Sequence, residues 1–187
     1  MITLIVELNN FIQKIILFKL NSIYRLLFII LIFLLGCKSR KNAEQVYSKN
    51  DDFTRNNIKL KDLNGFVVNL EKYEGKTLFI NFWATWCKPC IEEMPSIESA
   101  IKILRKENID FLFASEEDAA LISTYRMGNT YNFNYVRVDN SVELNIMALP
   151  TTFIFNPAGK LVFNESGSRQ WDDKNNIDLI LSIIQSK

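Results

Sequence analysis

Apolar residues are distributed unevenly along the chain and divide it into an apolar leader, a polar stretch and a packed domain. Residues 26–35 read LLFIILIFLL, an uncharged apolar run that Arg25 directly precedes. A basic flank before an apolar run of about 7–15 residues is typical of a secretory signal, whereas a membrane span needs about 20 residues. Residues 38–52 are polar, which favours a flexible tether. We therefore predict a leader at 1–36, a tether at 37–52 and a domain at 53–187.

Strand patterns and helix patterns alternate in the predicted domain. Continuous apolar runs that are rich in β-branched and aromatic residues predict buried strands at 77–83 and 109–114. Between them, an apolar stripe at helical spacing predicts a helix that starts within residues 87–90 and continues to about 106. Shorter patterns predict further strands at 58–61, 66–70, 135–138, 151–156 and 160–164, and further helices at 116–127 and 171–185.

The order of these elements indicates an α/β fold. The dipeptide Asn64-Gly65 is a strong turn signal and joins the first two strands into an N-terminal β-hairpin. The strand–helix–strand order that follows implies parallel strands with right-handed crossovers. A last hairpin, across residues 157–159, adds an antiparallel edge. We therefore expect a central mixed sheet flanked by helices.

Composition removes several classes of function. The formal net charge is +1 and no basic stripe with interleaved aromatic residues follows the leader, so nucleic acid is not an expected partner. Histidine is absent, which excludes an imidazole base and any metal site that needs a histidine ligand. Of the three cysteines, Cys87 and Cys90 are three positions apart, whereas Cys37 stands alone.

Cys87 and Cys90 are the candidate reactive pair. They open a predicted helix, and residues three apart on a helix face the same side, so their sulfurs can bond. At the helix N-terminus, unpaired N–H groups and the helix dipole stabilise a thiolate of Cys87, which is the nucleophile in disulfide exchange. Cys90, one turn further in, should be more buried and have the higher pKa. We therefore expect Cys87 to attack and Cys90 to resolve the mixed disulfide.

The neighbours of the pair fit the same chemistry. Lys88 is a cation that should lower the pKa of Cys87, although exposure will weaken its effect. Pro89 presets the backbone of the first helical turn, and Trp86 offers a flat apolar surface for a partner chain. One alternative is that the two cysteines form half of a zinc site, but zinc needs about four ligands and the chain has no histidine and no second cysteine pair. Another is a purely structural disulfide, but so short a loop constrains the unfolded chain least. The redox group is the disulfide itself, so neither a metal ion nor a separate cofactor is expected.

Three stretches carry a resemblance to a known family: NFWATWCKPC at 81–90, IEEMP at 91–95 and LPTTF at 149–153. They resemble the TlpA-like branch of the thioredoxin superfamily, which includes the ResA-like proteins. The likeness covers residues 53–187, and it implies a thioredoxin-like fold and a thiol–disulfide oxidoreductase activity. It also implies that Pro150 is a cis-proline, which would hold the Leu149 backbone beside Cys87 for an extended substrate segment.

One position departs from thioredoxin itself. Thioredoxin has a buried aspartate as a proton carrier where this chain has Asn81, which does not titrate. An asparagine is common there in the TlpA-like branch, and a glutamate that corresponds to Glu93 is thought to take over. Because Glu93 is one turn beyond Cys90 on the same helix face, we hypothesise that it manages the Cys90 proton. The alternative is an exposed acid that favours the helix dipole.

The direction of electron flow separates the candidate functions. A reductase of exported protein disulfides is favoured, with haem-attachment cysteines of c-type cytochromes as the family-typical substrate and a membrane thiol protein as the upstream electron donor. The motif lacks an imidazole, so we expect only a modest lowering of the pKa of the Cys87 thiol and a reducing potential. A disulfide oxidase or isomerase stays open within this class. A peroxiredoxin-like thiol peroxidase and a copper-binding assembly factor are alternatives from other classes, and their local cysteine patterns are absent here.

Cys37 has a separate role. It ends the apolar run in LLGC at 34–37, which resembles the lipobox of bacterial lipoproteins, where cleavage precedes a cysteine that is then lipidated. The alternative is an uncleaved signal anchor with an incidental cysteine. Either attachment places the domain in the cell envelope, membrane-anchored and facing the periplasm, where disulfide chemistry is sustained.

Overall fold

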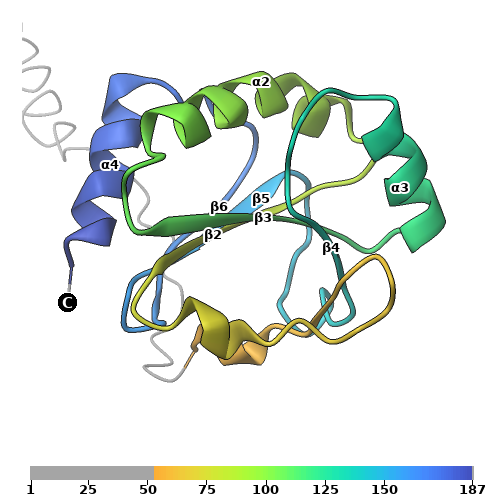
Figure 1. Ribbon diagram of the computed structural model, residues 1–187, viewed down its shortest axis with the longest axis horizontal. Coiled ribbons are helices and arrows are strands. Elements are labelled where there is room, and N and C mark those ends of the chain that lie inside the picture. Colours follow the sequence, from red (N-terminus) through yellow and green to blue (C-terminus); the bar gives the residue numbers. More distant parts are fainter. Residues whose placement is uncertain (1–52, 187) are drawn as a thin grey trace, which may run out of the picture. The chain divides into compact units, whose positions relative to one another are not determined.

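A six-stranded mixed β-sheet is the central layer of residues 53–186, the part of the chain that the computed structural model describes (Figure 1). The strands lie in the order β1-β4-β3-β2-β5-β6. They are β1 (Leu60–Lys61), β2 (Thr77–Phe82), β3 (Ile109–Ser115), β4 (Tyr135–Val138), β5 (Thr151–Phe155) and β6 (Leu161–Ser166). The helices are α2 (Lys88–Ile103), α3 (Ala119–Met127) and α4 (Lys174–Ile184), with short 3-10 helices η1 (Arg55–Asn57) and η2 (Leu70–Tyr73).

The connections between strands place the α-helices on one face of the sheet. Strand β2 pairs with β3, and β3 with β4, in parallel, whereas the pairs β1–β4, β2–β5 and β5–β6 are antiparallel. The crossovers β2–α2–β3 and β3–α3–β4 move in the same direction across the sheet. Because parallel crossovers are right-handed, both helices then lie on the same face. In Figure 1, α2, α3 and α4 lie above the sheet, and the yellow helix η2 lies below it.

Each face of the sheet has its own hydrophobic core. Under the helices, Phe79 of β2 belongs to a cluster with Met94 and Ile97 of α2. On the other face, Leu78 and Ile80 belong to a cluster with residues of η2 and β5. Successive strand residues point to opposite faces, and both faces are covered, so all six residues of β2 are buried. This buried strand leads directly toward the two cysteines.

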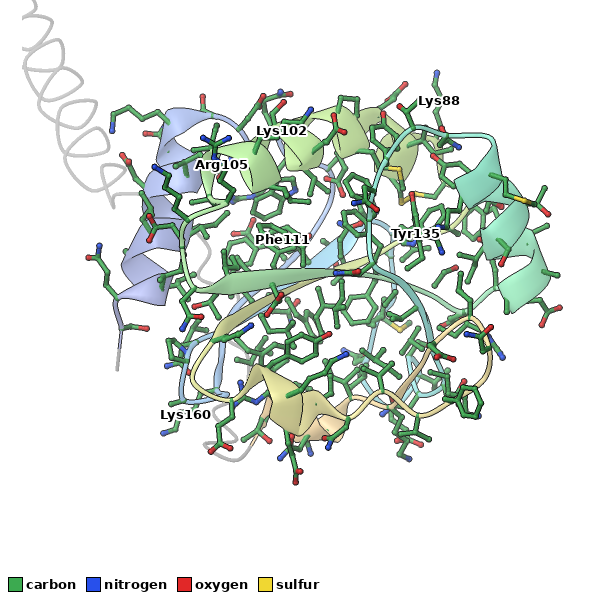
Figure 2. The ribbon with its side chains drawn as sticks, in the orientation of Figure 1. Lys88, Lys102, Arg105, Phe111, Tyr135 and Lys160 are labelled. Atoms are coloured by element: carbon green, nitrogen blue, oxygen red, sulfur yellow. A yellow bond between two sulfur atoms is a disulfide. The ribbon has the colours of Figure 1, made fainter. Side chains whose placement is uncertain are left out.

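Aromatic side chains fill much of the space between the sheet and the helices. Phe111 and Tyr135 lie in this interior, whereas Lys88, Lys102 and Lys160 point outward from the protein (Figure 2). Aromatic residues bury large areas, so they dominate the energetics of a core of this kind.

The α/β architecture predicted from the sequence is confirmed, but the N-terminal hairpin is shorter than predicted. The chain turns at Gly65, which has a φ of 89°, and a single antiparallel bridge joins Lys61 to Val67. The second arm forms no strand beyond this bridge, and β1 takes β4 as its main partner. Phe66 and Val67 are 71% and 78% exposed, so burial does not stabilise the second arm.

Two helices begin later than the sequence pattern indicates. Helix α3 starts at Ala119 rather than at 116, because the Glu117 side chain bonds to the backbone of another loop instead of capping a first turn. Helix α4 starts at Lys174, where the side chain of Asp173 caps it by accepting a hydrogen bond from the backbone. Its buried residues are Ile177, Ile180 and Ile183.

The predicted leader, the tether and the lipidation residue Cys37 lie outside the described residues. The predicted domain start at residue 53 stays a prediction. Within residues 53–186, no helix is both long enough and apolar enough to cross a membrane.

Candidate active site

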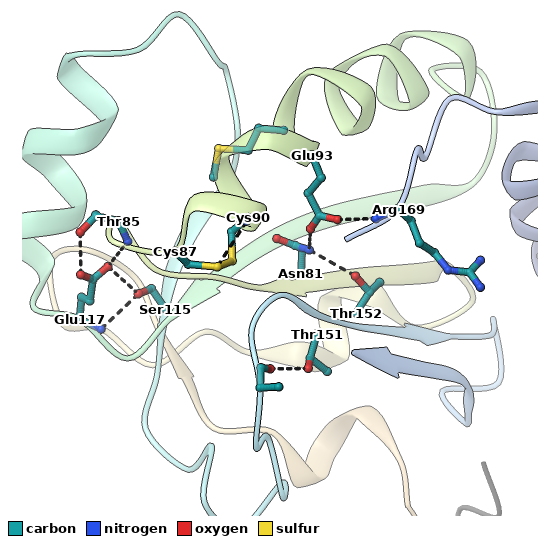
Figure 3. Close-up of a disulfide and its surroundings, with 12 residues drawn as sticks. Asn81, Thr85, Cys87, Cys90, Glu93, Ser115, Glu117, Thr151, Thr152 and Arg169 are labelled. Atoms are coloured by element: carbon teal, nitrogen blue, oxygen red, sulfur yellow. Dashed lines mark hydrogen bonds between the residues drawn. A yellow bond between two sulfur atoms is a disulfide. The ribbon is translucent and has the colours of Figure 1, made fainter. Parts of the chain in front are cut away.

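The two predicted cysteines form a disulfide at the start of α2 (Figure 3). Cys87 is the N-cap of the helix, and its Sγ accepts a hydrogen bond from the backbone N–H of Cys90 at 3.3 Å. The unpaired N–H groups of the first turn and the helix dipole place partial positive charge near this sulfur. A thiolate that forms on Cys87 after reduction is therefore stabilised.

The residues within and around the motif have unequal exposure. Cys90 is fully buried, and Cys87 is 4% exposed, which is the order that the sequence predicts. Pro89 lies in the first turn of the helix, as expected. The Lys88 side chain is 86% exposed, and its ammonium lies 3.6 Å from the carboxylate of Glu92. Water and this partner screen the Lys88 charge, so its effect on Cys87 is small.

A tight turn connects β2 to the helix and presents an exposed ring. The Trp83 N–H donates to the Ala114 carbonyl at 3.0 Å, and the Cys87 N–H donates to the Ala84 carbonyl at 3.1 Å. Trp86 lies within this turn and is 74% exposed. The flat apolar surface predicted from the sequence is therefore accessible and directly precedes the attacking cysteine.

Glu117, which follows the C-terminal end of β3, holds this turn in place, and no pattern in the sequence predicts this contact. Its carboxylate accepts hydrogen bonds from the N–H and the hydroxyl of Thr85, both at 2.7 Å, and from the hydroxyl of Ser115 at 3.2 Å (Figure 3). Thr85 and Glu117 are 32 positions apart, so no local pattern in the sequence reveals the pair.

Glu93 is 3% exposed, so the alternative of an exposed helix acid is wrong. The Asn81 side-chain amide donates to one carboxylate oxygen at 2.7 Å. The Arg169 N–H and the Trp171 indole N–H donate to the other, at 3.0 Å and 3.3 Å. Burial raises the pKa of Glu93 above its ordinary value of 4.5, and these hydrogen bonds, which favour the charged form, offset only part of that effect.

Asn81 lies between two polar partners in the core. Its amide nitrogen donates to Glu93 and, at 3.2 Å, to the Thr152 hydroxyl of β5. Because a carboxylate accepts and does not donate, this contact fixes which end of the amide is nitrogen. Within the described residues, Asn81 Oδ1 has no hydrogen-bond partner, and it points toward the disulfide in Figure 3.

The peptide bond between Leu149 and Pro150 is cis, as the resemblance implied. The Pro150 carbonyl accepts a hydrogen bond from the Gly167 N–H at 2.8 Å, and the Thr151 hydroxyl donates to the Ala148 carbonyl at 2.7 Å. The Leu149 side chain is partly buried and packs against both hydrophobic cores. These contacts hold the loop that precedes β5 in a defined conformation.

A groove of about 360 Å³ lies beside the active-site turn. It brings together two of the predicted substrate-binding residues, Trp86 and Leu149, and Met147 and Glu117 also line it. We call it the Trp86–Leu149 groove. An incoming chain that reaches Cys87 next to Trp86 therefore has a hollow in which to place a side chain.

Comparison with known proteins identifies the family. A model of the AhpC/TSA family matches residues 52–164. The thiol–disulfide oxidoreductase ResA of Geobacillus kaustophilus is 34% identical over 127 residues, which cover 66% of this chain and 70% of that protein. The chain belongs to the AhpC/TSA family and is a thiol–disulfide oxidoreductase of ResA type.

Other relatives agree with this assignment. The ResA of Bacillus subtilis is 32% identical over 111 residues, 57% of this chain and 62% of that protein. The thioredoxin-like protein YneN of the same species is 34% identical over 146 residues, 70% of this chain and 82% of that protein. A solved structure of a candidate thiol–disulfide oxidoreductase from Bacteroides vulgatus is 25% identical, with a TM-score of 0.59 over 67% of this chain and 91% of that one.

The family assignment confirms the thioredoxin-like fold and the class of reaction expected from the sequence. The structure adds partners that the sequence did not show, because Arg169 and Trp171 reach Glu93 from more than 70 positions away. It also places Trp86 and Leu149 in one groove.

The raised pKa of Glu93 predicts that stability falls as pH rises. A carboxyl whose pKa is higher in the folded protein binds its proton more tightly there than in the unfolded chain. Its contribution to the free energy of unfolding is therefore greatest below the unfolded pKa, about 4.5, and is lost as pH rises through the folded pKa. Urea unfolding of the oxidised protein at a series of pH values measures this contribution as the difference between wild type and Glu93→Gln.

The difference between the two unfolding free energies should decline across that pH window and then become constant. Glu98→Gln is the matched control, because Glu98 lies on the same helix but is partly exposed and pairs with Lys102 at 2.8 Å. The decline should be specific to the buried carboxyl, so Glu98→Gln should not reproduce it. A Glu93→Gln difference that does not vary with pH contradicts the prediction.

Proposed function

We propose that this oxidoreductase is a membrane-tethered, extracytoplasmic reductase of protein disulfides. The observation that carries the proposal is the asymmetry of the disulfide. Cys87, which is 4% exposed, caps α2 and directly follows the exposed Trp86, whereas Cys90 is fully enclosed and precedes the buried Glu93 by one helical turn. This arrangement supports one sulfur that attacks a partner and a second sulfur that resolves the complex.

The proposed reaction transfers two electrons to the substrate. In the reduced protein, the Cys87 thiolate attacks one sulfur of a substrate disulfide, and the other substrate sulfur leaves as a thiolate that takes up a proton. Cys90 then loses its proton and attacks Cys87 Sγ, which forms the internal disulfide and releases the second substrate thiolate. An upstream membrane thiol protein reduces the Cys87–Cys90 disulfide again. No separate cofactor takes part in this scheme.

Glu93 is proposed to manage the proton of Cys90. It follows Cys90 by one helical turn, and its raised pKa makes it a stronger base than an exposed carboxylate. Asn81 supports this role, because its amide nitrogen bonds to Glu93 while its unpaired Oδ1 points toward the disulfide. After reduction, this oxygen can accept a hydrogen bond from the Cys90 thiol, which would keep Cys90 protonated until Cys87 has reacted.

Weak stabilisation of the Cys87 thiolate favours reduction over oxidation. A strongly stabilised thiolate stabilises the dithiol form and makes the pair an oxidant. The chain contains no histidine, and the Lys88 ammonium is exposed and close to Glu92. The helix N-terminus is then the main stabilising group, so we expect a reduction potential toward the reducing end of the range from about −270 to −120 mV.

The leader and Cys37 support the proposed location in the cell envelope, with the domain facing the periplasm. The sequence LLGC at 34–37 follows a basic flank and a short apolar run, which fits lipid attachment at Cys37. The resemblance to ResA-like proteins supports exported cysteines as substrates, in particular the haem-attachment cysteines of c-type cytochromes.

The substrates can be trapped with Cys90→Ser. This variant leaves Cys87 to attack but removes the resolving thiol, so substrate proteins should remain attached through a disulfide that a reductant releases. The trapped partners are identified by mass spectrometry after release. The double variant Cys87→Ser/Cys90→Ser is the control and should capture none of them. No enrichment over this control argues against a dedicated substrate, and a measured potential near −120 mV overturns the choice of reductase.

Glu93→Gln should slow the resolving step by about 10- to 100-fold, because positioned proton acceptors contribute rate factors of at least this order. Rapid mixing of the reduced protein with a model disulfide should show the mixed disulfide accumulating, with the pKa of Cys87 little changed. Glu98→Gln, on the same helix, should behave as wild type. An unchanged resolving rate and an unchanged Cys90 pKa in a folded Glu93→Gln protein would falsify the role.

Cys37→Ser tests the tether. Mass spectrometry of the wild-type protein should show cleavage before Cys37 and an attached lipid, and cell fractionation should find the protein with the membrane. The variant should lack the lipid and keep its leader uncleaved. An uncleaved wild-type leader with an unmodified Cys37 would support the signal anchor instead.

A further inference from the structure

The Trp86–Leu149 groove is lined mainly by apolar residues and also by two glutamates. Apolar lining comes from the ends of β2, β3 and β4 and from the loop before β5, and it includes Phe82, Ala114, Val138, Ile146 and Leu149. Among residues 53–186, the charged residues that line the groove are Glu116 and Glu117, and no lysine or arginine does so. The groove therefore combines an apolar surface with negative charge.

One of these two negative charges, that of Glu117, is fixed in place. The Glu117 carboxylate is held by neutral donors, the two groups of Thr85 and the hydroxyl of Ser115. The neighbouring cation Arg137 donates to the Glu117 backbone carbonyl at 3.2 Å, and its guanidinium lies 4.0 Å from the carboxylate of Asp139. Within the described residues, neither Glu116 nor Glu117 forms an ion pair, so their charge is available to a partner.

We propose that the groove binds a lysine or arginine side chain of the substrate, next to the disulfide that Cys87 attacks. These side chains have an apolar stem and a cationic head, which match the apolar walls and the carboxylates. The exposed ring of Trp86 adds a surface over which a cation is favourable. A purely apolar side chain would bury apolar surface but leave the carboxylates without a counter-charge, and an acidic side chain would be repelled.

The position of the groove indicates where the cation lies in the substrate. The groove includes Trp86, which precedes Cys87, and Leu149, which precedes the cis-proline. In an extended segment, side chains two positions apart point to the same side. A substrate cysteine that faces Cys87 therefore has a residue two positions away that faces the groove side. This inference rests on the proposed reductase function and names the chemistry of its substrate.

The test uses peptide dimers linked by a single disulfide, in which lysine, norleucine or glutamate stands two residues before or after the cysteine. The reduced protein should reduce the lysine peptide with a kcat/KM about 2- to 5-fold above that of the norleucine peptide, as expected for one exposed ion pair. The glutamate peptide should be the slowest. High salt should reduce the preference, because it screens exposed charges.

Glu116→Gln should lower the preference for lysine, because it removes one of the two groove carboxylates. The variant is suitable because Glu116 is exposed and, within the described residues, its side chain holds no other element in place. Glu117→Gln is not suitable, since Glu117 also anchors the turn before Cys87. Glu107→Gln is the matched control: Glu107 is exposed and lies before the opposite end of β3, so the preference should stay unchanged.

Two kinds of failure are distinguishable. Equal rates for the lysine and norleucine peptides, or a preference that Glu116→Gln does not lower, would overturn the inference and leave the reductase intact. If neither the peptides nor a small aromatic disulfide is reduced, the proposed reductase function fails and the inference fails with it.

Discussion

The burial of one carboxylate, that of Glu93, is the constraint on which the rest of the active site depends. An isolated charge in a protein interior is costly unless donors surround it. The donors around Glu93 come from β2 and from the segment that precedes α4, through Asn81, Arg169 and Trp171. These elements must therefore meet α2 at one point for the core to close. The same contacts fix the rotation of α2 about its axis, and with it the direction in which Cys87 and Cys90 face.

The disulfide separates two environments with different chemistry. On the inner side, Asn81 and Glu93 form a buried polar pair, which suits the handling of a proton. On the outer side, the turn at Trp86 faces solvent, and Glu117 anchors it to the end of β3. Proton transfer benefits from a shifted pKa, which the buried side provides, whereas partner binding needs accessible surface, which the outer side provides. The N-terminus of α2 brings both within reach of one pair of sulfurs.

The sequence predicted those features that depend on local pattern. The apolar run of β2 and the apolar stripe of α2 predict two buried elements, and the spacing of Cys87 and Cys90 at their junction predicts that the two sulfurs can bond. Features that depend on contacts between residues far apart in the sequence were not predicted. The pairing of Thr85 with Glu117 shifted the start of α3, and exposure of Phe66 removed the reason for a second hairpin strand. For Glu93 the pattern placed the residue on the correct helix face, but only its partners in the folded chain show that it is buried.

The acidic residues near the motif connect the two proposals. Glu116 and Glu117 line the groove beside the active-site turn, whereas Glu92 pairs with the exposed Lys88. Negative charge near a thiol opposes ionisation, so it acts against the helix dipole and limits the stabilisation of the dithiol form. A less stabilised dithiol is a better electron donor. The charges that would attract a basic substrate segment therefore also favour electron flow toward it, and one electrostatic feature would set both the direction of exchange and the choice of partner.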